Sequence, residues 1–265
     1  MKIAFIGAGR MAEALIARLP RGVIVSDIRR ERLNHLKKKY KARIAKSNLA
    51  AFQEGEIVIL AVKPQQMAEV MEELRAGHLK PRKSKLVISI AAGIPLVYLQ
   101  QKMPGYPIIR AMPNNPCLIG EGATALAKGK KVTKAQYQKA ERIFSSVGEV
   151  IGIPEKWMDA VTGLSGSGPA YVYQVIDALA EGGAAAGLPR KLAMKLALQT
   201  VAGSAGTAKQ TRQSPQALCE MVASPGGTTV EGLKALEKFR FRQALAEAVK
   251  AAAKKSRTLS QRWTL

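Results

Sequence analysis

The sequence predicts an α/β protein with a doubly wound, mainly parallel sheet, followed by an all-helical C-terminal domain. Two observations carry this prediction. In the first half, short apolar runs alternate with helical patterns, which is typical of a parallel sheet covered by helices. From about residue 154 onward the strand-like runs stop, and alanine-rich helical patterns take over. We therefore expect two domains, residues 1–154 and residues 155–265.

Each expected element of the first domain rests on its apolar spacing. Strands are expected where four to seven mostly apolar residues lie between turn signals, over residues 2–7, 22–26, 56–62, 85–90 and 107–111, with 122–127 and 149–153 extending the sheet. Helices are expected where apolar residues recur at helical spacing, over residues 10–19, 29–40, 65–75 and 134–147.

The second domain is predicted to contain helices only. Leucine, isoleucine, valine and methionine recur there at helical intervals, over residues 170–186, 190–209, 215–222, 229–237 and 242–259. Glycine and proline mark the boundaries at residues 166–169, 187–189 and 225–227. Ligand sites in proteins with such a layout commonly lie between domains.

The charge of the chain is strongly positive, with a net charge of +23 and a pI near 10.2. Lysines and arginines are dispersed along the chain, however, and aromatic residues make up 5% of it without alternating with basic ones. A stacking platform for nucleic acid is therefore not expected. A positive field would also favour anionic substrates and phosphorylated cofactors, and the meaning of the charge stays open.

Apolar stretches and the two cysteines indicate where the protein is located and whether it binds metal. No stretch is apolar for the length that a bilayer requires, and the N-terminus lacks the long apolar core of a signal peptide, so a cytoplasmic protein without membrane contact is expected. The two cysteines, Cys117 and Cys219, lie far apart and form no CxxC pair. Neither a disulfide framework nor a metal site is expected.

A dinucleotide-binding loop is predicted directly after the first strand. The pattern G-x-G-x-x-A opens the first helix and consists of Gly7, Ala8, Gly9, Arg10, Met11 and Ala12. The first glycine permits a tight turn, the second lets the backbone approach a pyrophosphate, and the alanine keeps the helix close to the sheet. This placement at the first strand–helix turn predicts a Rossmann-type domain that binds NAD or NADP.

The choice between the two cofactors depends on the end of the second strand. Asp27 stands where an acid would accept hydrogen bonds from ribose hydroxyls, which favours NAD. Arg29 and Arg30 follow at once, and either could pair with a 2′-phosphate, which favours NADP. The sequence leaves the preference between NADPH and NADH open.

A second unusual run lies just before the expected helix at residues 229–237. Ser224 is followed by Pro225, Gly226, Gly227, Thr228 and Thr229. Backbone N–H groups at a helix N-terminus can converge on a carboxylate, and a threonine hydroxyl can donate to or accept from a substrate nitrogen. Taken without other motifs, an N-cap with a flexible loop is the more ordinary interpretation of this run.

Six motifs in order make the chain resemble the pyrroline-5-carboxylate reductase family along nearly its whole length. They are FIGAGRMA (5–12), AVKP (61–64), SIAAG (89–93), IRAMPN (109–114), GLSGSGPAY (163–171) and SPGGTT (224–229). Two departures from the family pattern lie in loops: Ser214-Pro215-Gln216 and Asn115-Pro116. Neither removes a group that the chemistry obviously needs.

The resemblance implies an activity and a set of site residues. The expected reaction is NAD(P)H-dependent reduction of 1-pyrroline-5-carboxylate to L-proline, the last step of proline biosynthesis. The resemblance places the substrate carboxylate on Ser224, Gly226, Gly227, Thr228 and Thr229, with Thr229 hydrogen-bonding the ring nitrogen as the catalytic group. Besides the loop at residues 7–12, Asp27 and Arg29, it assigns the cofactor to Asn48, Ala61, Val62, Lys63, Pro64, Ala91, Ala92, Gly93, Met112, Pro113 and Asn114.

The resemblance also implies a homodimer through the helical domain, with larger rings such as decamers in some members. The sequence leaves three rival functions. A β-hydroxyacid dehydrogenase would use a catalytic lysine, for which Lys191 and Lys195 are available. A regulatory protein would bind NAD(P)H without turnover, and a nucleic-acid binder would use the positive charge.

Overall fold

The computed structural model describes residues 2–78, 81–82 and 84–263. By contacts between residues, the chain forms two compact units, of which unit 1 is residues 1–167 with residues 250–265 and unit 2 is residues 168–249. Each unit is described by itself. These units divide the chain after Ser167 and again before Lys250. The division into domains after residue 154, which the sequence predicts, stays a prediction.

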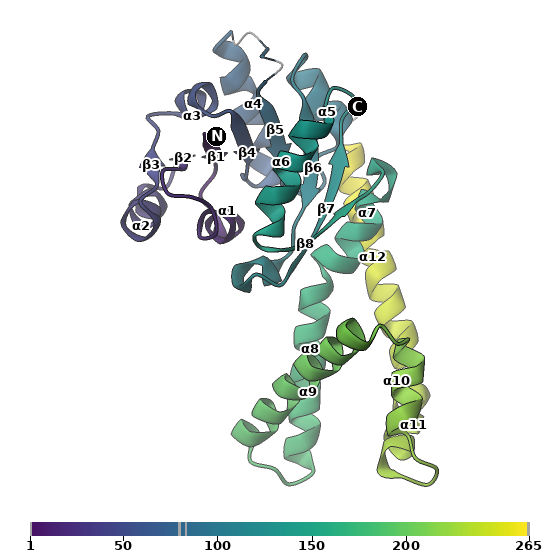
Figure 1. The fold of residues 1–265 in the computed structure, drawn as a ribbon. Helices are drawn as coiled ribbons and strands as arrows, with labels where there is room; N and C mark the ends of the chain where they lie inside the picture. The colour runs from purple at the N-terminus through teal and green to yellow at the C-terminus, as the bar shows by residue number, and fades with distance from the viewer. Residues whose placement is uncertain (1, 79–80, 83, 264–265) are drawn as a thin grey trace. The chain divides into compact units, whose positions relative to one another are not determined.

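Unit 1 is built on one eight-stranded sheet with the order β3-β2-β1-β4-β5-β6-β7-β8 (Figure 1). All neighbours pair in parallel except β6 and β7, which are antiparallel. The predicted strands are confirmed, as β1 (Ile3–Ile6), β2 (Ile24–Ser26), β4 (Ile57–Leu60), β5 (Leu86–Ser89), β6 (Ile108–Met112), β7 (Gly122–Lys128) and β8 (Gly148–Gly152).

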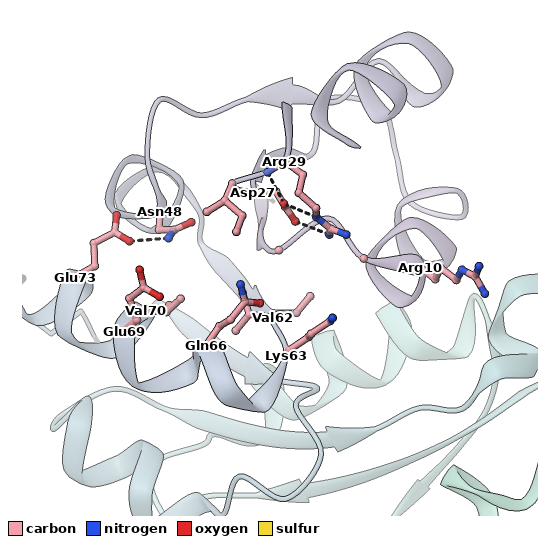
Figure 2. Close-up of a pocket in the computed structure, with 14 residues that line it drawn as sticks. Arg10, Asp27, Arg29, Asn48, Val62, Lys63, Gln66, Glu69, Val70 and Glu73 are labelled. Carbon is pink, nitrogen blue, oxygen red and sulfur yellow. Dashed lines mark hydrogen bonds and ion pairs between the residues drawn. The ribbon is translucent and has the colours of Figure 1, made fainter. Parts of the chain in front are cut away.

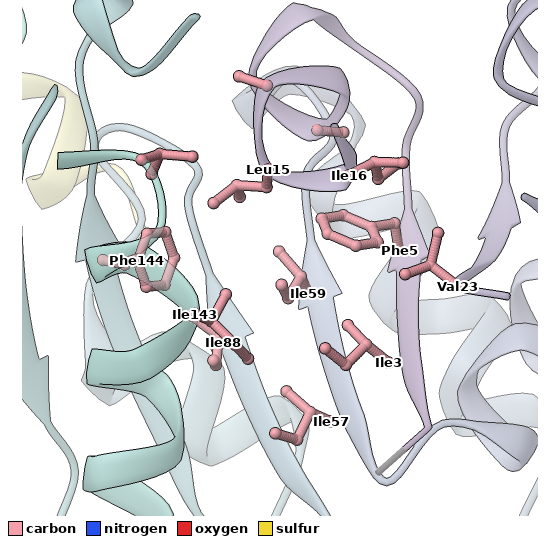
Figure 3. Close-up of a cluster of buried hydrophobic side chains, with 14 of the residues drawn as sticks. Ile3, Phe5, Leu15, Ile16, Val23, Ile57, Ile59, Ile88, Ile143 and Phe144 are labelled. Carbon is pink, nitrogen blue, oxygen red and sulfur yellow. The ribbon is translucent and has the colours of Figure 1, made fainter. Parts of the chain in front are cut away.

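Both faces of the sheet are buried at β1, β2, β4 and β5, which explains why these strands are continuous apolar runs. Ile3 and Phe5 of β1 face one hydrophobic cluster, and Ala4 and Ile6 face another. Figure 3 shows the first cluster, in which sheet residues pack against α1 (Arg10–Ile16) and α6 (Lys134–Ser145). The second cluster lies under α3 (Asn48–Glu54), α4 (Met67–Ala76) and α5 (Leu96–Lys102).

Several short elements were not predicted from the sequence, among them one strand and two helices of the sheet unit. The edge strand β3 has only two residues, Arg43–Ile44, and helices α3 and α5 have seven residues each. Helix α3 carries a usable signal, because the Ser47 side chain caps it by accepting a hydrogen bond from Ala50 N at 3.0 Å. Helix α2 (Arg30–Tyr40) was predicted, whereas α1 ends at Ile16, three residues before its expected end.

The last part of the chain returns to unit 1. Helix α12 (Phe241–Gln261) begins in unit 2, but Ser256 Oγ donates to Asp159 Oδ1 at 2.7 Å. The rings of Trp263 and Tyr98 pack edge to face with centroids 4.6 Å apart. These contacts fasten the final turns of α12 to the sheet unit.

Unit 2 consists of helices, as predicted: α8 (Gly168–Ala185), α9 (Arg190–Thr211), α10 (Pro215–Val222), α11 (Thr228–Lys238) and the first half of α12. Small residues bring α8 and α9 together, since a Cβ on Gly183 would lie 3.1 Å from the Ala193 Cβ. Many large apolar side chains of these helices are exposed, among them Tyr173, Leu196, Met221 and Phe239. In the described residues no helix is long and apolar enough to cross a bilayer.

Candidate active site

A cavity of about 540 Å³ lies where the strand order reverses around β1 (Figure 2). In a doubly wound sheet, ligands bind at the carboxyl ends of the strands at this point. The residues that line the cavity follow β1, β2 and β4 or lie on α3 and α4: Gly7, Gly9, Arg10, Asp27, Ile28, Arg29, Asn48, Ala61, Val62, Lys63, Gln66, Glu69, Val70 and Glu73.

The two glycines of the predicted loop differ in what surrounds them. Gly7 has φ +102°, and a Cβ there would lie 2.5 Å from the Ala61 carbonyl oxygen, so only glycine fits between β1 and β4. A Cβ on Gly9 would meet no protein atom within 4 Å. Gly9 lines the cavity and precedes the first N–H groups of α1, so its missing side chain leaves room for a phosphate there.

Asp27 is held by the chain itself. Its Oδ2 accepts from Ala8 N at 2.6 Å and from Arg29 Nη2 at 3.0 Å, and its Oδ1 accepts from Arg29 N at 2.8 Å and Arg29 Nε at 3.0 Å. Burial opposes the charge of Asp27, but the hydrogen bonds from Arg29 and Ala8 outweigh it and lower the pKa of the carboxyl. Asp27 is therefore ionised and paired.

Arg32 also fixes this loop, and sequence reasoning missed it. Its Nε donates to the Ala8 carbonyl oxygen at 2.9 Å, and its Nη2 donates to Glu13 Oε2 at 2.6 Å. Glu13 further contacts His35 Nε2 at 2.8 Å and Tyr40 Oη at 3.1 Å. Burial works against ionisation of Glu13, but these hydrogen bonds prevail and lower its pKa to about 2.

The wall opposite this loop comes from α3 and α4. Asn48 Nδ2 donates to Glu73 Oε2 at 2.6 Å. In Figure 2, Glu69 and Glu73 lie at one end of the cavity, whereas Arg10 and Lys63 lie at the other. Gln66, which precedes α4, and the α4 residues Glu69, Val70 and Glu73 were missed. Their spacing of three, four and seven places them on one helix face after Lys63-Pro64.

The other predicted cofactor residues lie outside the lining of this cavity. Ala91, Ala92 and Gly93 follow β5, and Met112 to Asn114 end β6 or follow it. Because β1, β4, β5 and β6 are parallel neighbours, these segments continue along the same carboxyl edge of the sheet. Ala8, Met11 and Pro64 each adjoin a lining residue in sequence, and Ala12 follows Met11. None of these four residues lines the cavity itself.

The side chain of Asn114 joins two segments of unit 1. Its Nδ2 donates to the Ser165 carbonyl oxygen at 3.0 Å, and its Oδ1 accepts from Ala123 N at 2.8 Å. Ser165 lies in a π-helical turn, Thr162–Gly166, and Pro169 has no N–H to serve as the usual partner four residues on. Asn114 Nδ2 thus donates to a carbonyl group whose usual partner four residues on lacks an N–H.

The glycine–threonine run lies in unit 2 at the N-terminus of α11. Gly226 has φ +71°, and Gly227 N donates to the Ser224 carbonyl oxygen at 2.9 Å. Gly227 is the N-cap residue and offers no side chain to the first N–H groups of the helix. Thr228 and Thr229 form the first turn. The structure confirms that a helix begins directly after the two glycines. The role of these residues in substrate binding stays a prediction.

Comparison with known proteins gives the family. A family model described as pyrroline-5-carboxylate reductase dimerisation matches residues 155–259, and one described as NADP oxidoreductase, coenzyme F420-dependent, matches residues 2–93. The curated pyrroline-5-carboxylate reductase of Synechocystis sp. is 47% identical, with 99% of each chain covered. The chain belongs to the pyrroline-5-carboxylate reductase family.

Solved structures of family members agree with the fold. A pyrroline-5-carboxylate reductase from Coxiella burnetii superposes with a TM-score of 0.90 at 36% identity, covering 98% of both chains. The enzyme from Plasmodium falciparum, solved with NADP bound, has a TM-score of 0.87 at 34% identity and the same coverage. The resemblance and the fold class expected from the sequence are confirmed, and the match disfavours the hydroxyacid dehydrogenase alternative.

Proposed function

We propose that the protein reduces the C=N bond of 1-pyrroline-5-carboxylate to L-proline with NADPH, the last step of proline biosynthesis. Membership of the pyrroline-5-carboxylate reductase family, at 47% identity to a full-length relative, is the observation that carries the proposal. The cavity at the carboxyl ends of β1, β2 and β4 supports it, because its size and glycine-rich floor suit a dinucleotide.

The cofactor site is proposed to run along the carboxyl edge of the sheet. Gly9 and the first turn of α1 would face the pyrophosphate, with Asp27 and Arg29 on the adenosine side. Residues 61–64, 91–93 and 112–114 would follow toward the nicotinamide. When bound, NADPH supplies the hydride that the imine carbon accepts, and the imine nitrogen gains a proton.

The substrate carboxylate is proposed to bind the turn from Ser224 to Thr229. The first N–H groups of α11 point out of a helix N-terminus whose cap residue has no side chain, which favours an anion. Thr229 would hydrogen-bond the ring nitrogen and so orient the imine. Its hydroxyl would act by orientation, since holding two reactants in place can supply several kcal/mol of the barrier reduction.

The oligomer is proposed to be a homodimer formed through the helices of unit 2. The match to the dimerisation model over residues 155–259 supports oligomer formation, and the exposed apolar side chains of α8 to α11 offer surface to cover. Light scattering of the purified protein measures the size, including any larger ring such as a decamer. The cytoplasmic location and the lack of nucleic-acid or metal binding remain predictions.

The activity can be tested directly with the purified chain. NADPH oxidation should depend on added pyrroline-5-carboxylate, and mass spectrometry should identify proline as the product. Three outcomes would contradict the proposal: tight NADPH binding without turnover, oxidation of hydroxyacids in place of imine reduction, or retention on DNA at physiological salt with neither activity. NADH run in parallel gives the cofactor preference.

A further inference from the structure

The acid at the end of β2 has no acceptor left for a ribose. An ionised carboxylate offers about four lone-pair sites. In Asp27 these are taken by Ala8 N, Arg29 N, Arg29 Nε and Arg29 Nη2, all within 3.0 Å. Only 6% of the Asp27 side chain is exposed. The usual interpretation, in which such an acid binds ribose hydroxyls and selects NAD, would require these bonds to break.

Asp27 instead fixes the loop on which a pyrophosphate would lie. Ala8 is held at both of its backbone polar groups, because its N–H donates to Asp27 and its carbonyl oxygen accepts from Arg32 Nε at 2.9 Å. Gly7 N also donates to the Ser26 carbonyl oxygen at 2.8 Å. The loop between β1 and α1 is therefore tied to the segment that follows β2.

Asp27 also presents Arg29 to the cavity. It binds Nε and one N–H of Nη2, which leaves both N–H groups of Nη1 and one of Nη2 from the five of a guanidinium. The Arg29 side chain is 47% exposed and lines the cavity (Figure 2). A planar fork that is fixed on one edge is prepared to bind a phosphate with the other.

We propose that Asp27 is a positioning residue for NADPH, which holds Arg29 for the 2′-phosphate and Ala8 for the pyrophosphate and does not select NADH. Arg29 is then the specificity-determining residue, and Asp27 acts through it. This inference rests on the proposed function only in that the cavity binds a dinucleotide. It reverses the preference that an acid at this position would suggest.

The test measures dissociation constants for NADPH and for NADH by fluorescence, with the full-length protein and no imine present. Arg29→Ala should weaken NADPH about tenfold or more and change NADH less than about threefold. Asp27→Asn should also weaken NADPH more than NADH. When Arg29 is already alanine, adding Asp27→Asn should leave the ratio of the NADH and NADPH dissociation constants unchanged. The reason is that Asp27 affects specificity through Arg29. Arg30→Ala, at an exposed neighbouring cation, is the matched control.

Three results would overturn the inference. A tighter NADPH complex of Asp27→Asn with a weaker NADH complex would make Asp27 a ribose-binding acid. Equal weakening of both cofactors would make its role structural only, and an unchanged NADPH affinity of Arg29→Ala would remove Arg29. Arg29→Ala changes an exposed side chain, so its result stays informative if Asp27→Asn does not fold. Because no imine is used, these results are independent of whether the chain makes proline.

Discussion

The two turns predicted to bind ligands, residues 7–12 and 224–229, differ in how firmly the rest of the chain holds them. The turn at residues 7–12 is tied by Asp27, Arg32 and the backbone of Ser26, and Gly7 lies against Ala61. The turn at residues 224–229 has one backbone bond of its own, and a Cβ on Gly226 would meet no atom within 4 Å. The fold of unit 1 thus prepares a nucleotide site, whereas the second turn depends on its local backbone.

The strongest way to break the first turn is Gly7→Ala. Positive φ and the approach to the Ala61 carbonyl oxygen together should cost about 3 kcal/mol of unfolding free energy. Urea denaturation followed by circular dichroism measures this loss. A change below about 1 kcal/mol would show that the turn can move away from β4, and that it is less fixed than described.

At the second turn, Thr229→Ala should act on catalysis and leave the fold intact. Thr229 lies in the first turn of α11 and is only partly buried, so little stability should be lost. Turnover with pyrroline-5-carboxylate should fall about 100-fold, because a misplaced reactant can lose about that factor in rate, while the NADPH dissociation constant stays the same. Thr207→Ala, on an exposed face of α9, is the control, and normal turnover of Thr229→Ala would remove this residue from the mechanism.

Gly9→Ala sharpens the contrast within the first turn itself. Its added methyl group meets no protein atom, so the unfolding free energy should change by less than about 1 kcal/mol. The methyl group projects into the cavity, however, and NADPH affinity should fall about tenfold, or 1.4 kcal/mol. Paired with Gly7→Ala, it separates a glycine needed by the fold from one needed by the ligand. Unchanged NADPH binding would place the pyrophosphate elsewhere.

The smallest expected effect concerns the Glu13 cluster that supports the loop. Its folded-state pKa of about 2 lies below the ordinary value of 4.5, so Glu13 contributes stability above pH 4.5 that is lost as the pH falls toward 2. Glu13→Gln should lower the unfolding free energy by about 1 kcal/mol at neutral pH. The unfolding free energy of this variant should also fall less steeply as the pH is lowered below 4.5. Denaturation midpoints at several pH values test this, and an unchanged fall at acid pH would show that other carboxylates dominate.

The sequence predicted most of this architecture because its signals are local. The apolar run at residues 57–62 and the glycines of the first loop can each be recognised from the residues next to them in sequence. The bonds from Arg29 to Asp27 are local, since Arg29 lies two residues after Asp27. The bond from Ala8 N to Asp27 could not be predicted, because these two residues meet only once β1 and β2 pair. Asn114 is a similar case: its motif was visible, but its bond to Ser165 depends on a π-helical turn that no spacing rule indicates.

The return of α12 to unit 1 has a consequence for biosynthesis. Residues 250–263 leave the ribosome after all of unit 2 has been made, yet Ser256 and Trp263 pack on residues of the sheet unit. The sheet unit can therefore gain these contacts only after residues 250–263 have left the ribosome. A nascent chain halted inside α12 would carry a complete sheet that still lacks its last packing partner.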